Sequence, residues 1–271
     1  MRSYPQERGT SFNGTGLTNS FATSISNNEE TEIDQLAYLF NHELMHNWIG
    51  GGIKNADEEA QYWFSEGFTE YYTAKNIASY GIGGRDWSFF IDNLNENIRL
   101  LEASAVKEAP NSEITYENFW KDPEYGKLPY RRGMLFACYL DLKLQAVSEG
   151  KHNLDDVMRD LLQASRETGQ ELTHTHFLKT VNAYLPQDLT PFFNRHIISG
   201  EALPLGELAR ARVAEVASSE QVDLVDVFRR PAALRRFTGM DVERAGRALT
   251  SPILAGPCTH RSRPGLVPWP R

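Results

Sequence analysis

The sequence predicts a mainly α domain that begins with a small β-strand region and continues into a helical lobe. Residues 1–28 are rich in Gly, Ser, Thr and Asn, a composition that favours short strands and turns. From Ile33 onward, apolar residues recur at spacings of three and four, the period of a helix with one buried face. Beyond residue 84, further helical segments are separated by Gly and Pro. A chain of 271 residues with 41% hydrophobic content can bury a sizeable core.

The N-terminal region contains its clearest strand candidate at residues 20–26. Its apolar residues are spaced for short extended segments: Phe12, Leu17, Phe21 and Ile25. We expect one or two exposed strands before residue 28, and a frayed N-terminus is the alternative. An exposed strand beside a cleft can bind a peptide by adding it to the edge of the sheet.

The first helix is predicted to run from a cap at Thr31 or a neighbour to about Ile49. Five residues form its apolar stripe: Ile33, Leu36, Ala37, Phe40 and Leu44. At about 100° per residue, His42 and His46 lie on the side away from that stripe. Positions four apart share one face, so both imidazoles can point at one metal ion with Glu43 beside them. The pattern His-Glu-x-x-His therefore indicates a zinc site with its own general base.

A second helix is predicted for roughly residues 59–79, after three consecutive glycines at 50–52. Glu66 and Glu70 share one face of this helix. Catalytic zinc usually takes three protein ligands, and two histidines with one carboxylate are a recurrent set. The predicted ligands of one zinc ion are His42, His46 and Glu66. Glu70 can accept the outward N–H of a ligand histidine, and a solvated surface charge is the alternative for this residue.

The segments His-Glu-Leu-Met-His-Asn-Trp (42–48) and Trp-Phe-Ser-Glu-Gly-Phe-Thr-Glu-Tyr-Tyr (63–72) resemble the gluzincin metallopeptidases. They are similar in particular to the membrane alanyl aminopeptidase and glycyl aminopeptidase families. The resemblance implies a thermolysin-like catalytic domain that holds one zinc ion and hydrolyses peptides. The interval between His46 and Glu66 is one residue longer than is usual in the alanyl aminopeptidases, so the glycine loop must absorb a residue.

The resemblance also implies a catalytic tyrosine in a Pro-Tyr-x-x-Gly-like segment that opens a helix. Residues 128–135, Leu-Pro-Tyr-Arg-Arg-Gly-Met-Leu, fit this pattern. Pro129 suits a helix start, and Tyr130 in the first turn would face the cleft and donate to an oxyanion. Judged by residue type alone, Tyr130 is a half-buried core tyrosine.

A Gly-rich substrate strand before the metal helix is a further element that the resemblance implies. Residues 13–20 resemble it, and the predicted substrate-binding residues are Gly14, Gly16, Leu17 and Thr18. Thr18 stands near the position of a glutamate that binds the amino terminus of the substrate in the family. A neutral hydroxyl cannot pair with an ammonium group as a carboxylate does. Exopeptidase and endopeptidase activity therefore both stay open.

The remaining helices are predicted at residues 129–148, 153–166, 173–184 and 188–198. The expected domains are a catalytic domain at 1–203, made of the strand region 1–28, the zinc helices 29–84 and the helical lobe 85–203, and a poorly defined Arg- and Pro-containing tail at 204–271. Full-length relatives carry a β-rich domain before the catalytic one. This chain has no room for it, so we expect a fragment or a reduced form.

The charge of the chain is unevenly distributed. The formal net charge is −8, but residues 201–271 carry eleven Arg against eight acidic residues, which leaves −11 on residues 1–200. An acidic catalytic body disfavours nucleic acid as a partner. The chain has no apolar run of about 18 residues and no signal-peptide core, so we expect no membrane segment and, by default, a cytoplasmic location. Cys138 lies in an apolar run and is predicted to pack as a small hydrophobe. The oligomeric state stays open.

The function predicted from these residues is zinc-dependent hydrolysis of peptide bonds, most consistent with an aminopeptidase. Zinc would activate water and polarise the scissile carbonyl. Glu43 would carry the water proton to the leaving amine, and Tyr130 would stabilise the oxyanion. The alternatives are hydrolysis of a non-peptide substrate such as an epoxide, and a truncated module that binds zinc or peptides without turnover. The presence of both Glu43 and Tyr130 favours an enzyme.

Overall fold

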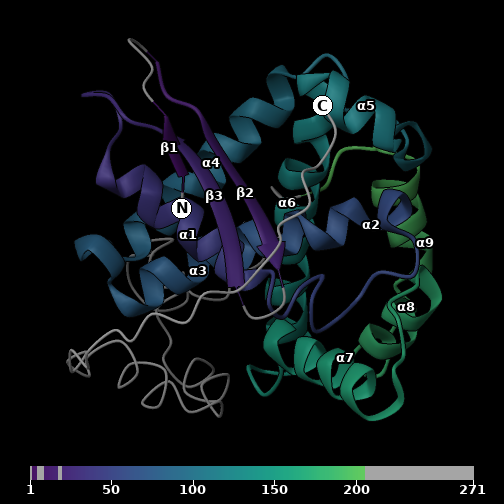
Figure 1. The fold of residues 1–271 in the computed structure, drawn as a ribbon. Coiled ribbons are helices and arrows are strands. Elements are labelled where there is room, and N and C mark those ends of the chain that lie inside the picture. The colour runs from purple at the N-terminus through teal and green to yellow at the C-terminus, as the bar shows by residue number, and fades with distance from the viewer. Residues whose placement is uncertain (1, 5–8, 18–19, 205–271) are drawn as a thin grey trace, which may run out of the picture. The chain divides into compact units, whose positions relative to one another are not determined.

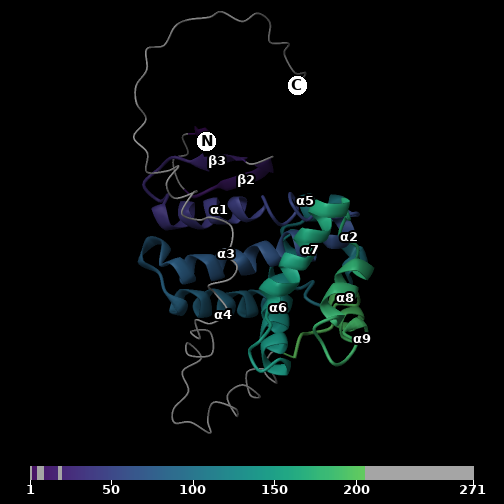
Figure 2. The same cartoon turned by 90° about the horizontal axis from the view of Figure 1, so that it is seen from below.

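A small β-sheet packs against a stack of helices in the computed structural model, which describes residues 2–4, 9–17 and 20–204 (Figures 1 and 2). The strands are β1 (Arg2–Tyr4), β2 (Phe12–Leu17) and β3 (Ser20–Ser26), in the spatial order β1-β3-β2. β2 is antiparallel to β3 and forms an edge of the described sheet, whereas β1 is parallel to β3. The predicted strand at 20–26 is confirmed.

Helix α1 (Ile33–Met45), which carries the two histidines, lies between this sheet and helix α3 (Gly67–Tyr80) (Figure 2). Glu32 and Gln35 form a capping box at its start. Phe40 of α1 contacts Phe21 of β3, with ring centroids 5.7 Å apart. The predicted apolar stripe is wrong at its ends, because Ile33 is 82% and Leu44 is 41% exposed. The helical periodicity alone therefore predicted more buried surface on this helix than the structure has.

The helix ends at Met45, four residues before the predicted end, because the following chain folds into a glycine loop. The N–H of Gly51 donates to the carbonyl of His46 over 3.0 Å, and that of Gly50 donates to Ile53 over 2.9 Å. Gly50 has φ of +92°, a conformation that favours glycine. The loop therefore brings the chain back beside the last turn of α1.

The predicted single helix over 59–79 is two helices, α2 (Glu58–Ser65) and α3 (Gly67–Tyr80), which meet at Glu66. At this junction Gly67 packs on Gly133 of helix α6 (Pro123–Val147). A Cβ on Gly67 would lie 2.3 Å from the Gly133 Cα, and a Cβ on Gly133 would lie 2.0 Å from the Trp63 carbonyl oxygen. Only glycine permits so close an approach of two backbones. The crossing positions Glu66 against α6.

Helix α6 begins at Pro123, six residues before the predicted start. Asp122 caps it by accepting from the N–H of Glu124 over 2.9 Å, and Pro123 occupies the first turn, where its missing N–H costs nothing. Pro129 lies inside the helix and is buried. The expectation that Pro129 opens the helix and Tyr130 lies in its first turn is therefore wrong, since a stronger cap precedes them.

The other described α-helices are α4 (Trp87–Ala103), α5 (Tyr116–Lys121), α7 (Leu154–Thr168), α8 (His174–Asn182) and α9 (Thr190–Phe193), the last continued by a π-helical turn, Asn194–Ile198. Helices α7, α8 and α9 lie in predicted helical segments, whereas α4 and α5 were not predicted. Trp63 is buried at the centre of an aromatic cluster with rings from α3, α6, α8 and α9. Cys138 is buried in the same core, as predicted. A mainly α fold with a small N-terminal sheet is confirmed.

The described residues fall within one unit, Met1–Phe237. The predicted tail lies, apart from its first residue, outside the described residues, so the division into 1–203 and 204–271 stays a prediction. Among the described residues, every helix is too short or too polar to span a bilayer.

Candidate functional site

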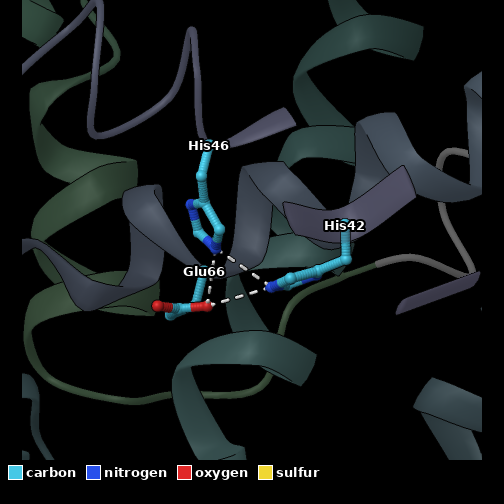
Figure 3. A group of neighbouring side chains, drawn as sticks. All are labelled: His42, His46 and Glu66. Atoms are coloured by element: carbon cyan, nitrogen blue, oxygen red, sulfur yellow. Dashed lines mark hydrogen bonds and ion pairs between the residues drawn. The ribbon is translucent and has the colours of Figure 1, made fainter. Parts of the chain in front are cut away.

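Three side chains, those of His42, His46 and Glu66, converge on one point (Figure 3). His42 and His46 project from α1 and its C-cap, and Glu66 projects from the junction of α2 and α3. The two Nε2 atoms are 3.1 Å apart, and Glu66 Oε2 lies 3.4 Å from that of His42 and 3.7 Å from that of His46. The structure therefore brings the three predicted ligands together. That they bind zinc stays a prediction.

The outer nitrogens of both histidines face oxygen atoms. His42 Nδ1 lies 3.0 Å from Glu70 Oε1, and His46 Nδ1 lies 3.2 Å from the carbonyl oxygen of Ile49. A proton on each Nδ1 leaves both Nε2 lone pairs aimed at the Glu66 carboxylate. Glu66 Oε2 is buried and has no hydrogen-bond partner among the described residues. Three electron-rich atoms facing one point repel one another unless a cation lies between them, so this donor set fits a zinc ion.

The charges around the site favour positive charge at this point. Burial lowers the pKa of His42, but close contact with the Glu66 and Glu70 carboxylates and their charges raise it overall to about 10. Burial raises the pKa values of Glu66 and Glu70, but contact with His42 and its charge help to hold both below the usual value. Burial lowers the pKa of His46, which keeps this imidazole neutral and able to donate a lone pair.

Glu70 is held on both sides. One oxygen faces His42, and the other accepts a hydrogen bond from the hydroxyl of Tyr38 on α1. The Glu70 side chain is only 16% exposed, so the alternative of a solvated surface charge is wrong. These contacts can fix the tautomer and orientation of His42, and the role of Glu70 beside a metal ligand stays a prediction.

Glu43 lies beside the three converging groups and is 5% exposed. Burial raises its pKa, the charge of His42 lowers it, and the charge of Glu66 raises it further. Its Oε2 atom is buried and has no hydrogen-bond partner among the described residues. A carboxylate whose pKa is raised in the direction of neutral pH is suited to accept a proton and to return it.

Tyr130 lies near the same centre, in the third turn of α6. Its ring stacks on that of His42, with centroids 5.9 Å apart and an interplanar angle of 19°. Burial raises its pKa, and interaction with Glu66 raises it further. The hydroxyl therefore keeps its proton at neutral pH and can donate a hydrogen bond. Although its place in the helix was predicted wrongly, Tyr130 does lie at the site.

Comparison with known proteins places this architecture in a family. The model of the peptidase family M1 domain matches residues 14–196, a segment that includes every residue of the site described above. The chain belongs to the peptidase M1 family.

Two individual proteins that this M1 chain resembles are both described as aminopeptidases. It is 28% identical to leucine aminopeptidase 2-2 of Meyerozyma guilliermondii, over 40% of this chain and 19% of that protein. The crystal structure of an aminopeptidase N family protein from Idiomarina loihiensis superposes with a TM-score of 0.63 at 24% identity, over 77% of this chain and 40% of that chain. This structural likeness shows a shared fold. The M1 chain spans about a fifth of the first protein and two fifths of the second.

The strand β2 of the M1 domain crosses directly over Glu43. A Cβ on Gly14 would lie 1.8 Å from Glu43 Oε1, so a larger residue would displace the carboxylate. Gly14, predicted as a substrate-binding residue, thus also sets the position of the candidate base. Gly16 pairs with Phe21 and Leu17 with Ser20 in the hairpin. Thr18 lies outside the described residues, and substrate binding by these four residues stays a prediction.

A cleft of about 960 Å³ opens over the M1 site. Glu43, Glu66 and Tyr130 line it beneath β2 and the glycine loop. One wall comes from α5, whose side chains Tyr116 and Trp120 also line the cleft. Sequence analysis missed this wall. Its local signal was a group of three aromatic residues, Tyr116, Phe119 and Trp120, within a short segment.

Proposed function

We propose that this M1 domain is a zinc-dependent peptidase of the aminopeptidase type. The observation that carries the proposal is the convergence of two imidazole nitrogens and one carboxylate oxygen beside a buried carboxylate and a protonated phenol, all in one cleft. The aminopeptidase type rests on the family and on the leucine aminopeptidase relative.

Each residue of the site has a distinct task in the proposed reaction. His42, His46 and Glu66 would hold the zinc ion, which when bound polarises a carbonyl group and makes water more acidic. Glu43 accepts the proton of the attacking water and returns it to the leaving nitrogen. The Tyr130 hydroxyl donates a hydrogen bond to the oxyanion that forms on the substrate. Glu70 holds His42 with its Nε2 lone pair turned inward.

The deciding experiment combines metal analysis with peptide cleavage. We expect elemental analysis to find one zinc ion per chain, and we expect a mixed peptide library to lose amino-terminal residues. Half of the library should carry acetylated amino termini, which an aminopeptidase leaves intact. Internal cleavage of acetylated peptides would instead show an endopeptidase. Bound zinc without cleavage would support the module that binds without turnover, and absence of zinc would overturn the proposal.

The supporting role of Glu70 gives a separate prediction. Glu70→Gln should weaken zinc binding about 10- to 100-fold, because the charge that orients His42 and strengthens it as a ligand is removed. Competition with a chelator of known affinity measures the change. Glu96→Gln is the matched control, since Glu96 is an exposed residue of α4 that pairs with Arg99. Equal zinc affinity of Glu70→Gln and the control would exclude this role for Glu70.

A further inference from the structure

The short helix α5 exposes two large aromatic side chains. Tyr116 is 62% and Trp120 is 67% exposed. They lie one turn apart on the same face, with ring centroids 6.2 Å apart at an interplanar angle of 61°. Large aromatic side chains normally contribute buried area, so an exposed pair facing a cleft indicates a surface that binds something.

Neither ring is needed to hold α5 in place. The helix is anchored by Phe119, which is 8% exposed and stacks on Tyr62 of α2 at 4.2 Å. Thr115 caps the helix by accepting from the N–H of Asn118 over 3.2 Å, and Glu59 accepts from the backbone N–H of Tyr116. These contacts do not involve the side chains of Tyr116 or Trp120. The two aromatic side chains can therefore be removed without removing the helix.

A series of ring contacts connects this pair to the centre of the site. Trp120 contacts Phe119 at 5.2 Å, Phe119 stacks on Tyr130 at 6.1 Å, and Tyr130 stacks on His42 at 5.9 Å. We call the exposed pair Tyr116 and Trp120 the rim of the cleft. An extended peptide advances about 3.3–3.6 Å per residue, so the rim lies within about five residues of the reacting bond. A side chain of a bound peptide can reach Trp120 while the peptide occupies the centre.

The chemistry of the rim selects an apolar group. Within the part of the chain that the structure describes, no cation lies over the ring of Tyr116 or Trp120. On α5 itself, Glu117 forms an ion pair with Lys121 at 2.7 Å, and Glu59 accepts from the backbone N–H of Tyr116 at the start of the helix. The two charges on α5 therefore offset each other, whereas exposed aromatic faces gain from contact with aliphatic or aromatic groups.

We propose that Tyr116 and Trp120 form a subsite for an apolar side chain of the peptide and so determine specificity. This inference rests on the proposed peptidase function. Tyr116 and Trp120 of α5 line the cleft together with Arg166 of α7, so the subsite occupies the part of the cleft that α5 contributes. The occupant is a leucine-like or phenylalanine-like side chain within a few residues of the cleaved bond.

The test compares peptides that differ at one position. A scanning set places Ala, Phe or Asp at each of five positions, and kcat/KM is measured for wild type, Trp120→Ala and Tyr116→Ala. At one position, wild type should prefer Phe, and Trp120→Ala should reduce the Phe-to-Ala preference about tenfold or more. Cleavage of the Ala peptide should change little. Tyr80→Ala is the matched control, because Tyr80 is 53% exposed at the end of α3 and does not line the cleft. An unchanged preference in Trp120→Ala would overturn the subsite.

A binding measurement separates failure of the subsite from failure of the proposed function. Isothermal titration calorimetry measures the affinity of the Phe and Ala peptides for two proteins, Glu43→Gln and the double variant Glu43→Gln/Trp120→Ala. If no variant cleaves any peptide but Trp120→Ala selectively weakens binding of the Phe peptide, the subsite is supported and the peptidase function fails. If wild type cleaves peptides without any apolar preference, the function is supported and the subsite fails. Self-association that is lost in Trp120→Ala would show that the rim binds a second copy, which also overturns the subsite.

Discussion

Glu43→Gln should lower kcat for peptide hydrolysis by about 10²- to 10⁴-fold while one zinc ion per chain stays bound. Glutamine has nearly the same size and keeps one oxygen, so the close contact with Gly14 can persist. Its amide cannot accept the proton of the attacking water. Because Glu43 lies beside the three predicted ligands and is not one of them, metal content and activity should separate. Elemental analysis and steady-state kinetics on the same preparation measure both quantities.

The matched control for this change is Glu167→Gln on α7, an exposed carboxylate that accepts a hydrogen bond from Gln163. It should retain wild-type kinetics and zinc content. Two results would count against the assignment of Glu43. Activity of Glu43→Gln close to wild type would mean that another group moves the proton, and loss of zinc would mean that Glu43 supports the metal instead.

Gly133→Ala should lower the free energy of unfolding by about 3 kcal/mol or more. Local helix propensity predicts the opposite sign, a gain of about 1 kcal/mol for Ala over Gly inside a helix. Packing should prevail because the new methyl would lie 2.0 Å from the Trp63 carbonyl oxygen and 2.8 Å from the Gly67 Cα, both of which are backbone atoms. α2 and α3 would have to move away from α6, and Glu66 would move with them. Chemical denaturation measures stability, and zinc content reports the displacement of Glu66.

Gly84→Ala provides the comparison, since a Cβ there meets nothing within 4 Å but the backbone has φ of +74°. Its cost should be about 1 kcal/mol, from backbone conformation alone. A Gly133→Ala protein as stable as wild type, with full zinc content, would contradict the close crossing of α3 and α6.

Much of the candidate site was predictable because its residues belong to short sequence motifs, in which the spacing of the side chains is fixed by the helix. Two histidines four residues apart share one face of a helix in any fold, so the pairing of His42 and His46 needed no tertiary information. The shared helix face and the usual ligand set of catalytic zinc then indicated Glu66 and Glu70, and the resemblance to gluzincins supplied Tyr130. The structure brings these residues together, and the family match includes all of them.

Predictions failed where long-range packing competes with local pattern. The periodicity over residues 59–79 indicates one helix, but contact with α6 divides it at Glu66. Pro129 looks like a helix start, yet the cap at Asp122 begins the helix earlier. Ile33 has the spacing of a core residue and is exposed, so helical periodicity alone predicted more buried surface on α1 than the structure has.

By itself, the sequence determined the mainly α fold class, the metal-ligand types and their spacing along each helix. Helical periodicity and ligand chemistry are local properties, which a run of a few residues specifies. Only the tertiary structure decided that Gly14 lies against Glu43, that Gly67 meets Gly133, and that the aromatic face of α5 forms a wall of the cleft. These contacts join residues from about 30 to 70 positions apart. Their geometry depends on how whole helices and strands pack against one another, and a short sequence pattern does not specify that packing.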